Sequence, residues 1–343
     1  MAYPSQHGRR PPEWASKVTH SQIIQDPEVQ AFLARCRLPA APNGGSLPDR
    51  RTLPYQPVAN NPIRHVIAID GGYTEIAVRD RFPSATLCFF QLGALTFRVA
   101  DLERLDRQAF IEPEDIARLK RIRRLKFVLP ERNVILRREP SLRHSVRRAL
   151  YTFCYRALAP ERLIASLGWL LYGGYQTSRQ AWRLGRCPIC GQGGVSLVRA
   201  EMSRRYTFPC PHCDGVLYLT DALRLHELVD EEWGASEILG YTLTAIEQLL
   251  LVHLIRLILR VKPSLLHELL FIKDGPLAFY GPPSALQQPM RALVRYLHAH
   301  HALYLAGLEK SGGFVEHAYA IADLLPAGSL LLFVSREQRE EYE

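Results

Sequence analysis

Two pairs of cysteines constrain this 343-residue chain more than any other feature of its sequence. Cys187-Pro-Ile-Cys190 and Cys210-Pro-His-Cys213 are C-x-x-C motifs separated by nineteen residues. This spacing brings four thiolates within tetrahedral reach of one Zn²⁺, and four cysteines leave no open position on the metal. A redox pair is the weaker alternative, because it needs a single C-x-x-C at the start of a helix. The sequence therefore predicts a structural zinc site of the zinc-ribbon type.

The residues around the motifs are typical of short strands. Residues 191–209 alternate like a hairpin, and residues 215–220 predict another strand. His212 is expected at the surface. The module is expected either to stiffen an insertion or to bind DNA or protein through its basic residues, Arg199, Arg204 and Arg205.

The charge of the chain favours a polyanionic partner. Its formal net charge is +9 and its pI is about 9.3. Residues 118–148 hold twelve Lys or Arg against two acids, so this run has few internal counter-charges. A solvated helix surface is the alternative to a nucleic-acid contact. The residues predicted to bind DNA are Arg137, Arg138, Arg147 and Arg148.

Composition and hydropathy indicate a globular protein. The apolar share is 47% and the charged share is 22%. The first fourteen residues lack the apolar segment of a signal peptide. The longest apolar stretch, residues 249–261, contains His253, Arg256 and Arg260 and is too short to span a bilayer. We therefore expect a cytoplasmic protein that does not enter a membrane.

The pattern of elements predicts an α/β fold. Residues 65–70, 74–80 and 84–99 look like strands joined by turns at Gly71–Gly72 and at residues 79–83, which indicates an antiparallel meander. Residues 235–261 predict one long helix that ends before Pro263. The expected divisions are a Pro/Arg-rich arm with one short helix at 1–62, a first core part at 63–150, a helical and zinc-ribbon insertion at 151–232 and a second core part at 233–343.

Two aspartates at strand ends suggest chemistry. Asp70 and Asp274 each end an apolar run and precede a glycine. One Asp-Gly pair is an ordinary turn former. The repetition of the pattern at two strand ends predicts that the two carboxylates converge at the rim of a sheet. Carboxylate oxygens at such a position are suitable ligands for Mg²⁺ or Mn²⁺. Glu247, in an almost wholly apolar helix, is the predicted third ligand, because a buried glutamate needs a partner or a metal.

Several residues near these acids are secondary candidates. Glu75 is the rival of Glu247 if a hairpin returns it beside Asp70, and Glu268 is a weaker one. Lys310 would offset the negative charge of a transition state. His317 would orient water or contact phosphate, although a lone helix histidine is more often structural.

These segments together resemble the NurA family of DNA nucleases. The matching pieces are "AIDGGYTEIAV" (68–78), the helix with Glu247, "LFIKDGPLAFYG" (270–281) and "GLEKSG" (307–312). By position, Asp70 and Asp274 match metal-binding aspartates, Glu247 the helix glutamate and Lys310 the basic residue. The resemblance implies an RNase H-like mixed sheet flanked by helices and a deoxyribonuclease that uses Mn²⁺ or Mg²⁺.

The resemblance also implies partners. Family members are 5′-to-3′ exonucleases and single-strand endonucleases that form ring-like homodimers. They dock on HerA, a hexameric translocase ATPase, in DNA end processing or phage defence. The leading hypothesis is thus a metal-dependent DNA nuclease. The alternative is a zinc-ribbon DNA-binding or adaptor subunit that recruits the ATPase but cleaves nothing.

Overall fold

The computed structural model describes residues 23–37, 52–79, 81–106, 123–176 and 179–332. The chain divides into two compact units, one of residues 1–57 with 320–343 and a core unit of residues 58–319. Most of the predicted N-terminal arm and the first basic residues of the run, Arg118, Lys120 and Arg121, lie outside the described residues.

The first unit joins the two ends of the chain. It contains α2 (Pro27–Leu33), whose N-terminus is capped by Asp26, and a pair of antiparallel strands, β1 (Thr52–Pro54) and β11 (Ser329–Leu331). The short helix of the arm is confirmed. The backbone partners of β11 lie on β1, so β11 groups with this unit, whereas the second core part is expected to extend over 233–343.

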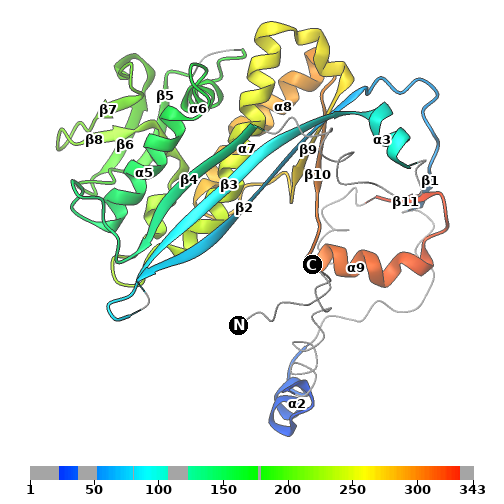
Figure 1. Ribbon diagram of the computed structural model, residues 1–343, viewed down its shortest axis with the longest axis horizontal. Helices are drawn as coiled ribbons and strands as arrows, with labels where there is room; N and C mark the ends of the chain where they lie inside the picture. The colour runs from blue at the N-terminus through cyan, green and yellow to red at the C-terminus, as the bar shows by residue number, and fades with distance from the viewer. Residues whose placement is uncertain (1–22, 38–51, 80, 107–122, 177–178, 333–343) are drawn as a thin grey trace. The chain divides into compact units, whose positions relative to one another are not determined.

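The core unit is built on a mixed five-stranded sheet with the order β10-β9-β2-β3-β4. The first three strands of this unit form an antiparallel meander, while β9 runs parallel to β2 and β10 parallel to β9 (Figure 1). The expected mixed sheet is therefore confirmed. The meander is not the predicted one, because the expected strands at 65–70 and 74–80 are the single strand β2, and the third strand, β4, lies within the basic run. The strands are β2 (His65–Arg79), β3 (Ala85–Arg98), β4 (Arg123–Arg132), β9 (Leu269–Asp274) and β10 (Tyr304–Leu308).

Helices pack on one face of this sheet. Strand alternation directs Ile69, Phe90, Phe127 and Phe271 to that face, where all four are buried. There α5 contacts β4, and α7 contacts β2, β3 and β9. We call this side the covered face and the other side the open face. The described helices of the core unit are α3 (Val99–Asp106), α5 (Leu142–Arg156), α6 (Leu163–Leu171), α7 (Leu239–Val261), α8 (Gln287–His301) and most of α9 (Gly313–Ile321), whose last two residues belong to the first unit.

β2 runs straight through the glycine pair, so the predicted turn at Gly71–Gly72 is wrong. A Cβ on Gly71 would lie 2.8 Å from the Leu243 Cδ1 and 2.8 Å from the Leu92 Cβ. The first glycine therefore serves the close approach of α7 to the sheet rather than a change of direction.

α7 confirms the predicted long helix. With the preceding residues from Ser236 it is, among the described helices, the one long and apolar enough to cross a membrane by length and composition. Most of that stretch is buried in the structure. The core helix of a soluble protein meets the same criterion.

The cysteine-containing insertion consists of two hairpins. The first pairs β5 (Ala181–Arg186) with β6 (Gly193–Val198), and the second pairs β7 (Thr207–Pro209) with β8 (Val216–Tyr218). The hairpin expected within residues 191–209 does not form, because each strand pairs across its own C-x-x-C motif instead. Short 3-10 helices connect the remaining elements at Arg199–Glu201, Leu219–Leu223, Leu225–Leu228, Ser236–Ile238, Pro263–Glu268, Pro282–Leu286 and Ala322–Leu324.

Candidate active site and zinc centre

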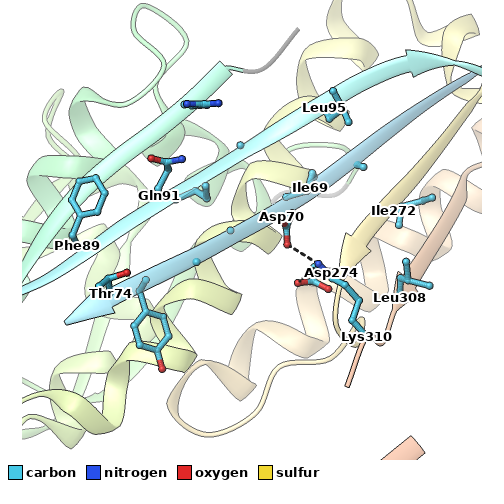
Figure 2. A pocket seen from close by; sticks show the side chains of 17 residues that line it. Ile69, Asp70, Thr74, Phe89, Gln91, Leu95, Ile272, Asp274, Leu308 and Lys310 are labelled. Carbon is cyan, nitrogen blue, oxygen red and sulfur yellow. Dashed lines mark hydrogen bonds and ion pairs between the residues drawn. The ribbon is translucent and has the colours of Figure 1, made fainter. Parts of the chain in front are cut away.

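Asp70, Asp274 and Lys310 meet on the open face of the sheet (Figure 2). The Lys310 Nζ lies 3.1 Å from the Asp70 Oδ1 and 3.1 Å from the Asp274 Oδ2. One ammonium thus bridges two carboxylates that are more than two hundred residues apart in the chain. Three of the four residues predicted to form the catalytic site are brought together.

The sheet itself produces this meeting. β9 pairs with β2 only as far as Ile69 and Lys273, so Asp70 and Asp274 are the next residues of two adjacent parallel strands. β9 ends at Asp274, and Gly275 has a φ of +72°, the left-handed conformation that glycine adopts at little cost. The Gly275 N–H donates to the Leu308 carbonyl at 2.9 Å, which sets the chain leading to Lys310 beside the two acids.

The charges at the site reinforce one another. The hydrogen bond to Asp274 is the main cause that raises the pKa of the Lys310 ammonium; burial opposes it, and the hydrogen bond to Asp70 adds to the rise. Because 56% of the Lys310 side chain is exposed, water screens these contacts. The lysine therefore stays protonated at neutral pH while remaining free to move from the carboxylates to another anion.

Glu247 lies on the covered face, with a partner that the sequence did not suggest. Its Oε2 is 3.1 Å from the Lys273 Nζ, and both side chains are almost fully buried. The Lys273 Nζ also donates to the Asp274 carbonyl oxygen. Burial raises the pKa of the Glu247 carboxyl; Lys273 opposes this rise, and the charges of Asp274 and Asp70 add to it. The charges of Asp70 and Asp274 therefore act on Glu247, although no hydrogen bond or ion pair between Glu247 and either aspartate is described.

The rival residues lie elsewhere. β2 does not turn back, so Glu75 is about 16 Å further along the strand than Asp70. The expectation that a hairpin returns Glu75 to the site is therefore wrong. Glu268 is 3.6 Å from His267 at the other end of β9. His317 lies on α9 and is not among the residues that line the pocket.

The two aspartates lie in a pocket of about 770 Å³. Its wall follows the open face across β2, β3 and β4, since the paired residues Asp70, Gly93 and Arg124 all line it. Thr74 and Gln91 add polar groups further along the same face (Figure 2). The pocket is acidic at the edge with Asp70 and Asp274 and basic at Arg124 on β4. It therefore suits a ligand that brings positive charge to the acids and negative charge to the arginine.

The four cysteines form a cluster as their spacing predicts. The Sγ atoms of Cys187, Cys190, Cys210 and Cys213 all lie within 4.8 Å of one another. Such a group could hold a metal ion such as zinc. Among the described residues, the carboxylate oxygens of Asp70, Asp274 and Glu247 do not form a comparable group with all ligand atoms within 4.8 Å of one another.

Backbone N–H groups at the cluster favour the thiolate of one cysteine, Cys210, whereas the pKa values of Cys187 and Cys213 are raised. Each C-x-x-C motif lies at the tip of a hairpin, where N–H groups point at the first sulfur: Ile189 N lies 3.3 Å from the Cys187 Sγ, and His212 N lies 3.4 Å from the Cys210 Sγ. Although burial opposes the change, the bonds from the His212 amide and the Cys187 thiol lower the pKa of Cys210 to about 7. Thiolates are the form that binds zinc. His212 is exposed, as expected.

The predicted DNA-binding arginines do not form one surface. Arg147 is wrongly assigned: it is 4% exposed, and its guanidinium forms a bidentate pair with Asp221, at 2.9 Å from Nε to Oδ1 and 2.7 Å from Nη2 to Oδ2. It joins α5 to the insertion and is too deeply buried to meet a phosphate at the surface. Arg137, Arg138 and Arg148 are exposed. Arg148 donates to the Tyr218 hydroxyl at 3.1 Å.

In comparisons with protein-family models, with curated proteins and with solved structures, nothing matches this chain.

Proposed function

We propose that this chain is a metal-dependent nuclease whose active site is the acidic edge of the open face. The observation that supports this most directly is the convergence of Asp70 and Asp274 on one cationic atom, the Lys310 Nζ. Two carboxylates that share a cation at exposed strand ends are suited to bind Mg²⁺ or Mn²⁺, which prefer oxygen ligands. The donor set therefore fits the metal that the NurA resemblance implies.

The roles of the residues follow from their positions. Asp70 and Asp274 would hold the metal, which supplies an activated water and offsets charge on a phosphate. Lys310, displaced from the carboxylates, would hydrogen-bond a phosphate oxygen and stabilise negative charge there. Lys273 holds the carbonyl of Asp274 from behind the sheet. Glu247 as a third ligand stays a prediction, and it requires the carboxylate to leave Lys273.

The strand order supports a finer proposal for the fold. Three antiparallel strands in chain order, with two parallel strands added beside the first, are what an RNase H-like core implies. We propose that fold for residues 63–319. The HerA-type ATPase, the homodimer and the role in end processing or phage defence remain proposals that depend on the NurA resemblance.

Cleavage of labelled single-stranded DNA in Mn²⁺ tests the proposal. We expect Asp70→Asn and Asp274→Asn each to lower the rate by at least about a hundred-fold, because each removes a metal ligand while leaving the strand intact. Asp323→Asn is the matched control, since Asp323 is an exposed acid of the other unit. Cleavage by Asp274→Asn at the wild-type rate would refute the site.

A non-catalytic zinc-ribbon adaptor is the second candidate. The observation that favours it is the closed four-thiol cluster at the tips of two hairpins. An adaptor would bind DNA, yet leave it uncut in both Mn²⁺ and Mg²⁺, with and without a HerA-type ATPase. That pair of results would replace the nuclease proposal with this one.

A further inference from the structure

A second hollow lies between the cysteine-containing insertion and α8, away from the acidic pocket. It has a volume of about 770 Å³ and is lined by β5 on one side and by the residues from Ser284 to Arg295 on the other. Among the residues that the structure describes, its charged lining consists of arginines without an acid. We call it the arginine groove, after the four arginines that line it, Arg179, Arg183, Arg291 and Arg295; Ser284, Gln287 and Gln288 add neutral polar groups.

The arginines of the groove are positioned by regular structure. Arg291 and Arg295 are one turn apart on α8, which places both guanidinium groups on one face, and both side chains are exposed. Across the groove, Arg183 is exposed on β5, where alternation turns its neighbour Trp182 inward to 9% exposure. The groove therefore has a packed floor and a charged rim.

The four arginines of the groove have no counter-charges among the described residues. Within the described residues, none of them has an ion pair with Asp or Glu, and neither β5 nor α8 contains an acid. Other surface arginines are paired: Arg224 lies 2.6 Å from Glu227, and Arg260 lies 2.7 Å from Glu161. Like charges gathered without acids repel one another, so the groove is most stable with an anion in it.

Another arginine-lined hollow of the core unit provides a comparison. It is also lined by four arginines, but Glu161 lies within it and pairs with both Arg256 and Arg260. There the chain supplies part of the compensating charge. In the arginine groove, no described residue supplies such a charge, so an external anion is the natural source of it.

We propose that the arginine groove binds the phosphate backbone of a nucleic-acid strand. Guanidinium groups match phosphate oxygens in a two-point geometry, and the amides of Gln287 and Gln288 add neutral donors. The spread of charge along one helix and one strand suits successive phosphates rather than a single small anion. The proposal deepens the proposed function by naming a second contact for its substrate, outside the acidic pocket.

Binding measured without divalent metal tests the groove separately from cleavage. Fluorescence anisotropy of labelled single-stranded and duplex DNA would be followed over a salt titration for the wild type and for Arg291→Gln/Arg295→Gln. Two lost phosphate contacts should flatten the slope of log K against log salt by roughly 1.4 on single strands and 1.8 on duplex. Between 50 and 200 mM salt, the wild-type affinity should therefore fall about ten-fold further than that of the variant.

A matched control removes the same charge elsewhere. Arg224→Gln/Arg260→Gln deletes two arginines that are already ion-paired and should keep the wild-type slope. Equal slopes for the groove variant and the wild type would overturn the proposal, as would competition by polyglutamate as strong as that by DNA. Weakened binding by the groove variant would support it even if the protein cleaves nothing. Cleavage with unchanged binding would support the nuclease proposal alone.

Discussion

We expect Lys273→Met to lower the free energy of unfolding by about 3–5 kcal/mol, the usual effect of removing one member of a buried ion pair. The Lys273 Nζ is 3.1 Å from the Glu247 Oε2, and the two residues are 1% and 3% exposed. At an effective dielectric constant of about 20, that distance corresponds to an attraction of roughly 5 kcal/mol. The substitution leaves Glu247 buried beneath the sheet without a cation, and it removes the donor to the Asp274 carbonyl.

The double variant that removes both charges should be much more stable than the single variant Lys273→Met. Lys273→Met/Glu247→Met replaces both charges with apolar groups of similar length, so the desolvation of two ions is no longer needed. We expect its stability to lie within about 1 kcal/mol of the wild type. Lys262→Met is the control, because Lys262 is exposed at the end of α7, and it should change stability by no more than about 0.5 kcal/mol.

The penalty should also depend on pH. Burial raises the pKa of Glu247, and Lys273 opposes that rise. In Lys273→Met the native carboxyl therefore binds a proton more readily than the unfolded one does, and stability falls as pH rises. The cost of the substitution should be smaller at about pH 5 than at about pH 8.

Urea unfolding of the zinc-loaded protein, followed by tryptophan fluorescence, measures these differences, because Trp169 and Trp182 lie in the core unit. A single variant that costs less than about 1 kcal/mol would refute the importance of the pair. A double variant whose cost equals the sum of the two single ones would show that the two side chains do not interact.

Three further perturbations test other parts of the core unit. Gly71→Ala should lower stability by about 1–3 kcal/mol, because its Cβ would lie 2.8 Å from the Leu243 Cδ1, while Gly72→Ala, with no atom within 4 Å, should cost less; thermal unfolding compares the two. Arg147→Ala should cost about 3–5 kcal/mol in urea unfolding by leaving the buried Asp221 without its bidentate arginine, whereas Arg148→Ala, at an exposed side chain, should cost no more than about 1 kcal/mol. Cys190→Ser should lower the bound zinc measured by atomic emission and expose the two hairpins to protease, and full zinc content in that variant would contradict the proposed cluster.

The sequence predicted the parts of the site that depend on strand ends. Apolar runs that stop at Asp70 and Asp274 fix those acids at the edge of a sheet, and the structure places them on adjacent strands. The cysteine spacing gave the thiol cluster in the same way. In the structure, strand alternation places Lys273 on the face opposite Asp274. Strand alternation tells which face a residue lies on, but not which helix covers that face. The ion pair of Lys273 with Glu247 on α7 therefore does not follow from the sequence pattern.

The errors have physical causes of the same kind. Arg147 was grouped with its basic neighbours by charge, although the helical period places it among Val146, Leu150 and Cys154, which are buried on α5. Gly71 was assigned to a turn by local chemistry, whereas its lack of a side chain serves contact with a distant helix. The pairing of β11 with β1 could not be predicted either, because short apolar strands carry no mark of their partner.

β2 runs on well beyond its parallel neighbour. From Asp70 to Arg79 it pairs with β3 on one side, and within the described residues no strand pairs with its other side. Ile76 and Val78 are exposed along this stretch. A strand with an unpaired edge can template the addition of another chain without breaking any existing hydrogen bond. During overexpression this edge is where aggregation would start, and one lysine or proline placed there is the smallest change that would prevent it.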